Sequence, residues 1–122
     1  MPHRSRKSPA AIRPRIRVTR EGDILLGPGK ADLLAAIGRL GGLGAAAEEL
    51  GMSYMRAWKL VQTLNRAFRA PLVHTERGGA RHGNAGLTPM GESVLALYRE
   101  MEAGSLAAMK PAWKRLRSLI AR

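Results

Sequence analysis

The sequence predicts a mainly α-helical domain with a small β wing. Two short helical segments are joined by a tight turn at Gly51, and a glycine-rich stretch between two short extended segments follows them. Apolar residues then recur at helical spacing almost to the end of the chain. Together these three observations predict a winged helix-turn-helix fold with a long C-terminal helix.

The N-terminal segment, residues 1–15, is rich in Pro, Ser and Arg and contains no acidic residue. Such a composition buries too little apolar surface to offset the entropy lost on ordering, so we expect a disordered basic arm. It would act either as a solubilising tail or as an arm that adds phosphate or minor-groove contacts to a bound duplex. Both interpretations remain open.

A folded domain is expected over residues 16–103. Alternating apolar residues from Ile16, interrupted by the turn residues 21–23, predict a short β-hairpin. Pro28 suits the first turn of a helix that ends before Gly41. The apolar positions of this helix recur at helical spacing and predict a core-facing stripe: Leu33, Leu34, Ile37 and Leu40.

The next two helices are predicted at residues 44–50 and 53–68. Gly51 can adopt the left-handed conformation that ends the first of them, and Ser53 can cap the second. The second is amphipathic. Its predicted core side is Ala57, Val61, Leu64 and Phe68, and its predicted polar side is Arg56, Lys59, Thr63 and Arg66.

A hairpin wing is predicted after this helix, with a strand at residues 72–77, a loop at 78–86 and a short return strand at Leu87 and Thr88. Thr88 is also placed to cap a further helix, which would begin at Pro89 and continue to about Ala103.

Residues 104–122 are predicted to form a C-terminal dimerisation or docking helix, which Pro111 would kink or restart. An apolar stripe that contains a tryptophan at a chain end is more typical of an interaction surface than of a solvated helix. The residues predicted to form the dimer surface are Met109, Trp113, Leu116 and Ile120.

The net charge points to a polyanionic partner. The chain has 21 Lys and Arg against nine Asp and Glu, a formal charge of +12. Such a field attracts nucleic acid, and double-stranded DNA is the expected partner. The sequence contains no Cys and no apolar run long enough to cross a bilayer, so we expect a cytoplasmic protein without a membrane partner.

The predicted DNA-binding residues begin the helix after Gly51. Arginine, methionine and tyrosine side chains there can reach base edges in a major groove, and Ser53 can touch phosphate. Trp58 is expected to pack rather than stack on bases. The wing cations would lie along the backbone or in a minor groove. The predicted set is Ser53, Tyr54, Met55, Arg56, Lys59, Arg77, Arg81 and His82.

Three stretches carry a family resemblance: GMSYMRAW at residues 51–58, the LVQTLN that follows Lys59, and LTPMG at residues 87–91. Over residues 16–103 the chain resembles the N-terminal domain of ModE-type molybdate-responsive regulators, and more distantly the DNA-binding domain of LysR-type regulators. The resemblance implies a homodimeric winged helix-turn-helix whose recognition helix begins at Ser53–Lys59. Gly42 and Gly44 stand where that family often has Ser.

The resemblance also implies molybdate or tungstate sensing by a separate C-terminal domain, for which a chain ending at Arg122 has no room. We therefore expect no cofactor in this chain, and a full-length relative or separate sensor as a possible partner. His3, His74 and His82 lack metal-ligand spacing, and no catalytic constellation is visible, so neither a metal site nor an enzyme is expected. Two alternatives are an interaction module that pairs with a full-length regulator and a non-specific, nucleoid-type DNA binder.

Overall fold

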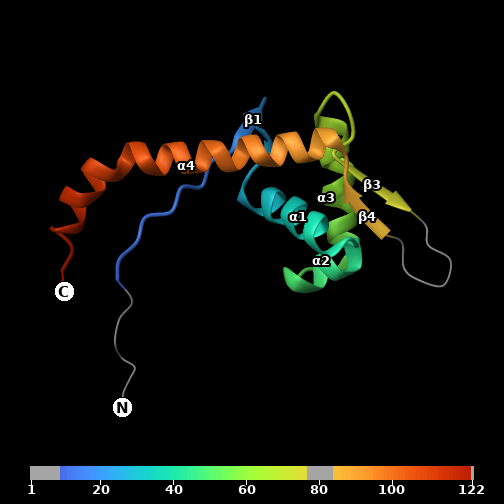
Figure 1. Cartoon of the computed structure of the whole chain (residues 1–122), viewed down its shortest axis with the longest axis horizontal. Coiled ribbons are helices and arrows are strands. Elements are labelled where there is room, and N and C mark those ends of the chain that lie inside the picture. Colours follow the sequence, from blue (N-terminus) through green and yellow to red (C-terminus); the bar gives the residue numbers. More distant parts are fainter. Residues whose placement is uncertain (1–8, 77–83, 122) are drawn as a thin grey trace, which may run out of the picture.

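The computed structural model describes residues 9–76 and 84–121. Four helices and two small β-hairpins make up this part of the chain (Figure 1). In chain order they are β1 (Val18–Arg20), β2 (Asp23–Leu26), α1 (Pro28–Leu40), α2 (Leu43–Glu49), α3 (Tyr54–Ala67), β3 (Val73–Glu76), β4 (Asn84–Leu87) and α4 (Pro89–Arg117).

Both hairpins are antiparallel. Thr19 pairs with Ile24 in the first, and Val73 pairs with Leu87 in the second. The second hairpin is tied to the helices through the α1–α2 turn, because the Ala85 amide donates to the Gly41 carbonyl oxygen at 3.0 Å. The predicted wing is therefore anchored beside the start of α2.

The core lies where α1, α2 and α3 meet. It is aliphatic apart from Tyr98, and small alanines let the helices approach closely. The fully or nearly fully buried side chains are Leu26, Ala31, Leu33, Leu34, Ala36, Ile37, Leu43, Ala46, Ala47, Ala57, Val61, Leu64, Leu72, Val73, Ala85 and Tyr98. The predicted core stripe of α1 is confirmed except for Leu40, which is exposed at the helix end.

Helix α4 is one continuous element from Pro89 to Arg117, and the prediction of a new start near Pro111 is wrong. Thr88 caps it as predicted, accepting a hydrogen bond from the Gly91 amide at 3.0 Å. The Tyr98 hydroxyl donates to the Ile16 carbonyl oxygen at 2.7 Å and so fastens α4 to the segment before β1. Beyond this bond, α4 extends away from the other helices (Figure 1).

The wing strands differ from the prediction in one respect. The return strand occupies Asn84–Leu87, earlier than the predicted Leu87 and Thr88. Gly86 and Asn84 were assigned to the loop because glycine and asparagine favour turns. Here their backbone groups pair with His74 and Glu76, and cross-strand pairing overrides that local preference.

Among the described residues, no helix is both long enough and apolar enough to cross a membrane.

Candidate nucleic-acid interface

The start of α3 is held by the turn that precedes it. Gly51 has a φ of 70°, in the left-handed region that a glycine adopts without steric cost. The Met52 amide donates to the Ala47 carbonyl oxygen at 3.0 Å, which closes the end of α2. Ser53 then caps α3 by accepting from the Arg56 amide at 3.1 Å, so the predicted cap is confirmed. The turn and the cap together fix the direction in which α3 leaves α2.

The first two turns of α3 present large side chains to solvent. Tyr54 is 50% exposed and Met55 is 57% exposed, while Ala57 on the opposite side is fully buried. Trp58 is 43% exposed, so part of its ring faces solvent beside this surface, and the expectation that it packs rather than stacks on bases stays a prediction. The buried side of α3 is formed by Ala57, Val61 and Leu64. The exposed face of α3 is thus both aromatic and cationic.

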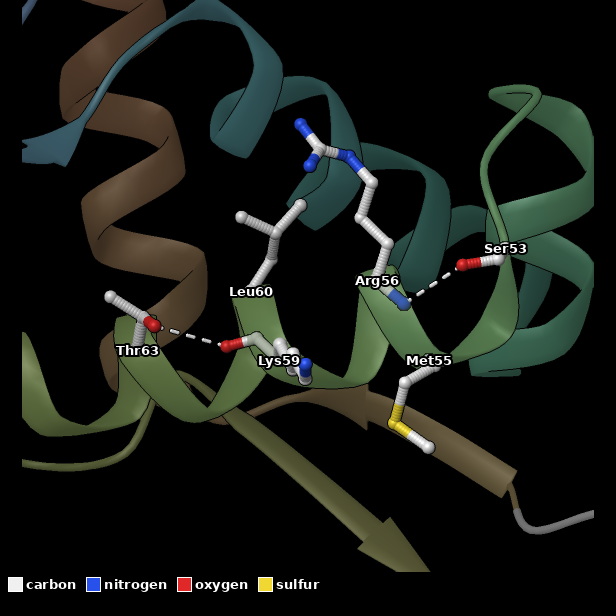
Figure 2. A pocket seen from close by; sticks show the side chains of 6 residues that line it. All are labelled: Ser53, Met55, Arg56, Lys59, Leu60 and Thr63. Carbon is white, nitrogen blue, oxygen red and sulfur yellow. Dashed lines mark hydrogen bonds between the residues drawn. The ribbon is translucent and has the colours of Figure 1, made fainter.

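A shallow hollow of about 330 Å³ lies along this face and is lined by Ser53, Met55, Arg56, Lys59, Leu60 and Thr63. Figure 2 shows Arg56 and Leu60 extending to one side of α3 and Met55 to the other. Four of the predicted DNA-binding residues therefore meet in one place: Ser53, Met55, Arg56 and Lys59. Tyr54 lies one position away, beside Gly44 at the start of α2.

Asn65 fixes α3 relative to the wing. Its side-chain oxygen accepts from the Leu72 amide at 2.8 Å and from the Val73 amide at 3.0 Å. Its side-chain nitrogen donates to the Val73 carbonyl oxygen at 3.0 Å. Asn65 is not among the predicted site residues, because its hydrogen bonds to Leu72 and Val73 form only when β3 lies beside α3 in the folded chain.

Arg77, Arg81 and His82, the predicted wing contacts, lie outside the described residues. His74 is exposed on β3. Within residues 9–76 and 84–121, no group of three or more His, Asp or Glu side chains is arranged to hold a metal ion.

The predicted dimer stripe lies on α4 and just beyond its end. Met109 and Trp113 are half-buried, Leu116 is exposed, and Ile120 is exposed in the turn after the helix. Buried or half-buried positions recur every three or four residues along α4, at Leu95, Tyr98, Glu102, Ser105, Met109 and Trp113. At this spacing they share one helix face, on which Tyr98 packs on the domain core.

A two-helix turn, an exposed cationic second helix and an anchored hairpin wing define a winged helix-turn-helix domain of the kind that places one helix in a DNA groove. Residues 30–92, just over half of the chain, match the model of bacterial regulatory helix-turn-helix proteins of the lysR family. The chain belongs to this family.

Curated relatives give a second comparison. The chain is 48% identical over 79 residues to the molybdenum-pterin-binding protein MopB of Rhodobacter capsulatus, covering 65% of this chain and 29% of that protein. It is 37% identical over 94 residues to MopA of the same organism, covering 77% and 36%. It is 36% identical over 84 residues to the molybdenum transport protein ModE of Azotobacter vinelandii, covering 69% and 31%. The matched segment therefore spans about a third of these relatives, and the predicted ModE resemblance is confirmed.

Proposed function

We propose that this chain is a sequence-specific transcriptional regulator that reads double-stranded DNA with the N-terminal half of α3. The single observation that carries the proposal is the exposed face of α3, where Met55 and Lys59 project beside the capped helix start. Lysine donates to guanine acceptors and an apolar side chain contacts the thymine methyl group, so this pair can distinguish bases. Its action on DNA would place the chain in the cytoplasm.

The reading role of α3 is tested with a Lys59→Ala variant. We expect a loss of about 1–3 kcal/mol in binding to the preferred duplex and relaxed preference at one base position, because one base contact is removed. Fluorescence anisotropy on a panel of single-base variants of that duplex measures both effects. Lys110→Ala on α4 removes the same charge away from α3 and serves as the control. Unchanged base preference in Lys59→Ala would refute the assignment.

We further propose that the chain acts as a homodimer through the C-terminal half of α4. The C-terminal half of α4 extends beyond helices α1–α3 (Figure 1), and Met109, Trp113 and Leu116 continue the face of Tyr98 at helical spacing. An apolar face that leaves its own domain can be buried by a second copy of the same helix. Two-fold pairing would present two α3 helices to half-sites one DNA turn apart, about 34–36 Å.

Leu116→Glu tests this dimer. A carboxylate on the apolar face would lose hydration when the two helices associate, so dimerisation should weaken by about tenfold to a hundredfold in sedimentation equilibrium. Lys114→Glu is the matched control, because Lys114 lies on the other side of α4 two residues earlier. A wild-type chain that sediments as a monomer at all concentrations would refute the homodimer.

The names of the relatives refer to molybdenum binding and transport. We therefore propose that the genes regulated by this chain act in molybdenum homeostasis. Sensing of molybdate or tungstate would then lie outside residues 1–122, in another domain or in a partner. Two alternatives remain from the sequence: an interaction module that pairs with a full-length regulator, which would bind DNA weakly alone, and a non-specific binder, which would show a steep salt dependence without base preference.

A further inference from the structure

A second, cationic pocket adjoins the exposed face of α3. It has a volume of about 250 Å³ and shares Arg56 and Leu60 with the hollow along α3. Its other lining residues come from the segment before β1, from β2, from the start of α1 and from the turn before α3: Arg15, Arg17, Ile24, Gly27, Pro28, Gly29, Lys30 and Met52. Four of the ten lining residues are cationic and none is acidic.

The cations are held in place by contacts on the far side of the pocket. Ile16 packs against the core, and its carbonyl oxygen accepts the Tyr98 hydroxyl, whereas Arg15 and Arg17 on either side of it are exposed. The Arg17 Cγ lies 3.5 Å from the point that a Cβ on Gly27 would occupy, so its stem runs across the β2–α1 junction. This anchoring positions both arginines at the pocket.

Lys30 and Arg56 complete the pocket from α1 and α3. The Lys30 Nζ donates to the Ile24 carbonyl oxygen at 2.6 Å, which holds the ammonium group at the pocket wall. Partial burial lowers the pKa of Lys30, and the nearby carboxylate of Asp23 opposes this shift. No cation of the pocket forms an ion pair with a carboxylate of residues 9–76 or 84–121. Four like charges around one hollow repel one another, and a bound anion relieves that repulsion.

We propose that the pocket formed by Arg15, Arg17, Lys30 and Arg56 binds a backbone phosphate of the DNA that α3 reads. The inference rests on the proposed function, because it is the shared Arg56 that joins the pocket to the reading face of α3. A phosphate beside the recognised groove fixes the register and orientation of a protein on the duplex without reading sequence. The segment before β1 thereby becomes part of the DNA interface.

The test compares Arg17→Ala with wild type in salt titrations of binding to the preferred duplex and to unrelated duplexes. We expect about tenfold weaker binding to every sequence and unchanged base preference. The slope of log K against log salt should become shallower by about 1. Arg20→Ala removes an arginine three residues later, in β1 and outside the pocket, and should change both values less. Ethylation interference should reveal one phosphate whose modification harms wild type and is neutral for Arg17→Ala.

Titration of inorganic phosphate into the free chain at constant ionic strength tests anion binding by the pocket independently of DNA binding. Phosphate should shift the amide resonances of Gly29 and Lys30 in the wild type, and Arg17→Ala should abolish these shifts. This result supports the anion pocket even if the wild type binds no DNA. In that case only the proposed function fails. If the wild type binds DNA and Arg17→Ala binds it with the same affinity and the same salt slope, the backbone-phosphate assignment is overturned. Equal losses in Arg17→Ala and Arg20→Ala also overturn it, because diffuse charge would then account for the effect.

Discussion

Gly91→Ala is expected to lose about 3 kcal/mol or more of the free energy of unfolding. A Cβ at Gly91 would lie 2.0 Å from the backbone oxygen of Leu72 and 2.9 Å from its carbonyl carbon. This oxygen cannot retreat easily, because it accepts from the Thr88 amide at 2.9 Å. The start of α4 would have to move away from β3, with loss of the Thr88 cap and of the packing around Leu72.

Urea denaturation followed by circular dichroism measures this loss. Gly104→Ala is the matched control, because Gly104 lies in the same helix and a Cβ there would meet nothing within 4 Å. It should stabilise the chain by about 0.5–1 kcal/mol through better helix propensity. Equal denaturation midpoints for Gly91→Ala and wild type would contradict the close approach of α4 to Leu72.

Asn65→Ala is expected to cost about 1.5–4.5 kcal/mol of the free energy of unfolding. The alanine removes three hydrogen bonds to the Leu72 and Val73 backbone, each worth about 0.5–1.5 kcal/mol net. β3 would then separate more easily from α3, and the wing would lose its fixed orientation relative to the reading face. We therefore expect weaker DNA binding even at temperatures where the variant is folded.

Asn65→Asp separates the acceptor and donor roles of this side chain. A carboxylate can still accept from the Leu72 and Val73 amides, but it cannot donate to the Val73 carbonyl oxygen. We expect a smaller loss than for Asn65→Ala, measured by urea denaturation at neutral pH. Arg66→Ala, at the next position and exposed, should stay within about 0.5 kcal/mol of wild type. An Asn65→Ala variant as stable as Arg66→Ala would contradict the clamp.

Local signals predicted most of the helical elements. Pro28, Ser53 and Thr88 each mark the start of a helix through chemistry that acts within one turn, and all three starts are confirmed. Pro111 misled the prediction, because a helix that loses one backbone hydrogen bond can still continue when the residues around it favour helix. The return strand was predicted too late in the sequence, because Asn84 and Gly86 are extended only through their pairing with β3.

The candidate site could be predicted only in part. The helical period separated Ala57 from Lys59 correctly, but it placed Trp58 at the border of the two faces, and only the packing of α3 decides its exposure. The cationic pocket joins Arg17 to Arg56, 39 positions apart in the sequence, through the contact between the segment before β1 and α1. No periodicity or motif within one segment indicates such a meeting.

The most direct test of the account is the selection of bound sites from random duplex DNA by the purified chain at near-physiological salt, with and without molybdate. The account predicts enrichment of one two-fold symmetric motif whose half-sites lie about one helical turn apart. Enrichment should not depend on molybdate, because the reading face is formed within residues 53–63. Retention of DNA without any enriched motif would contradict sequence-specific reading by α3.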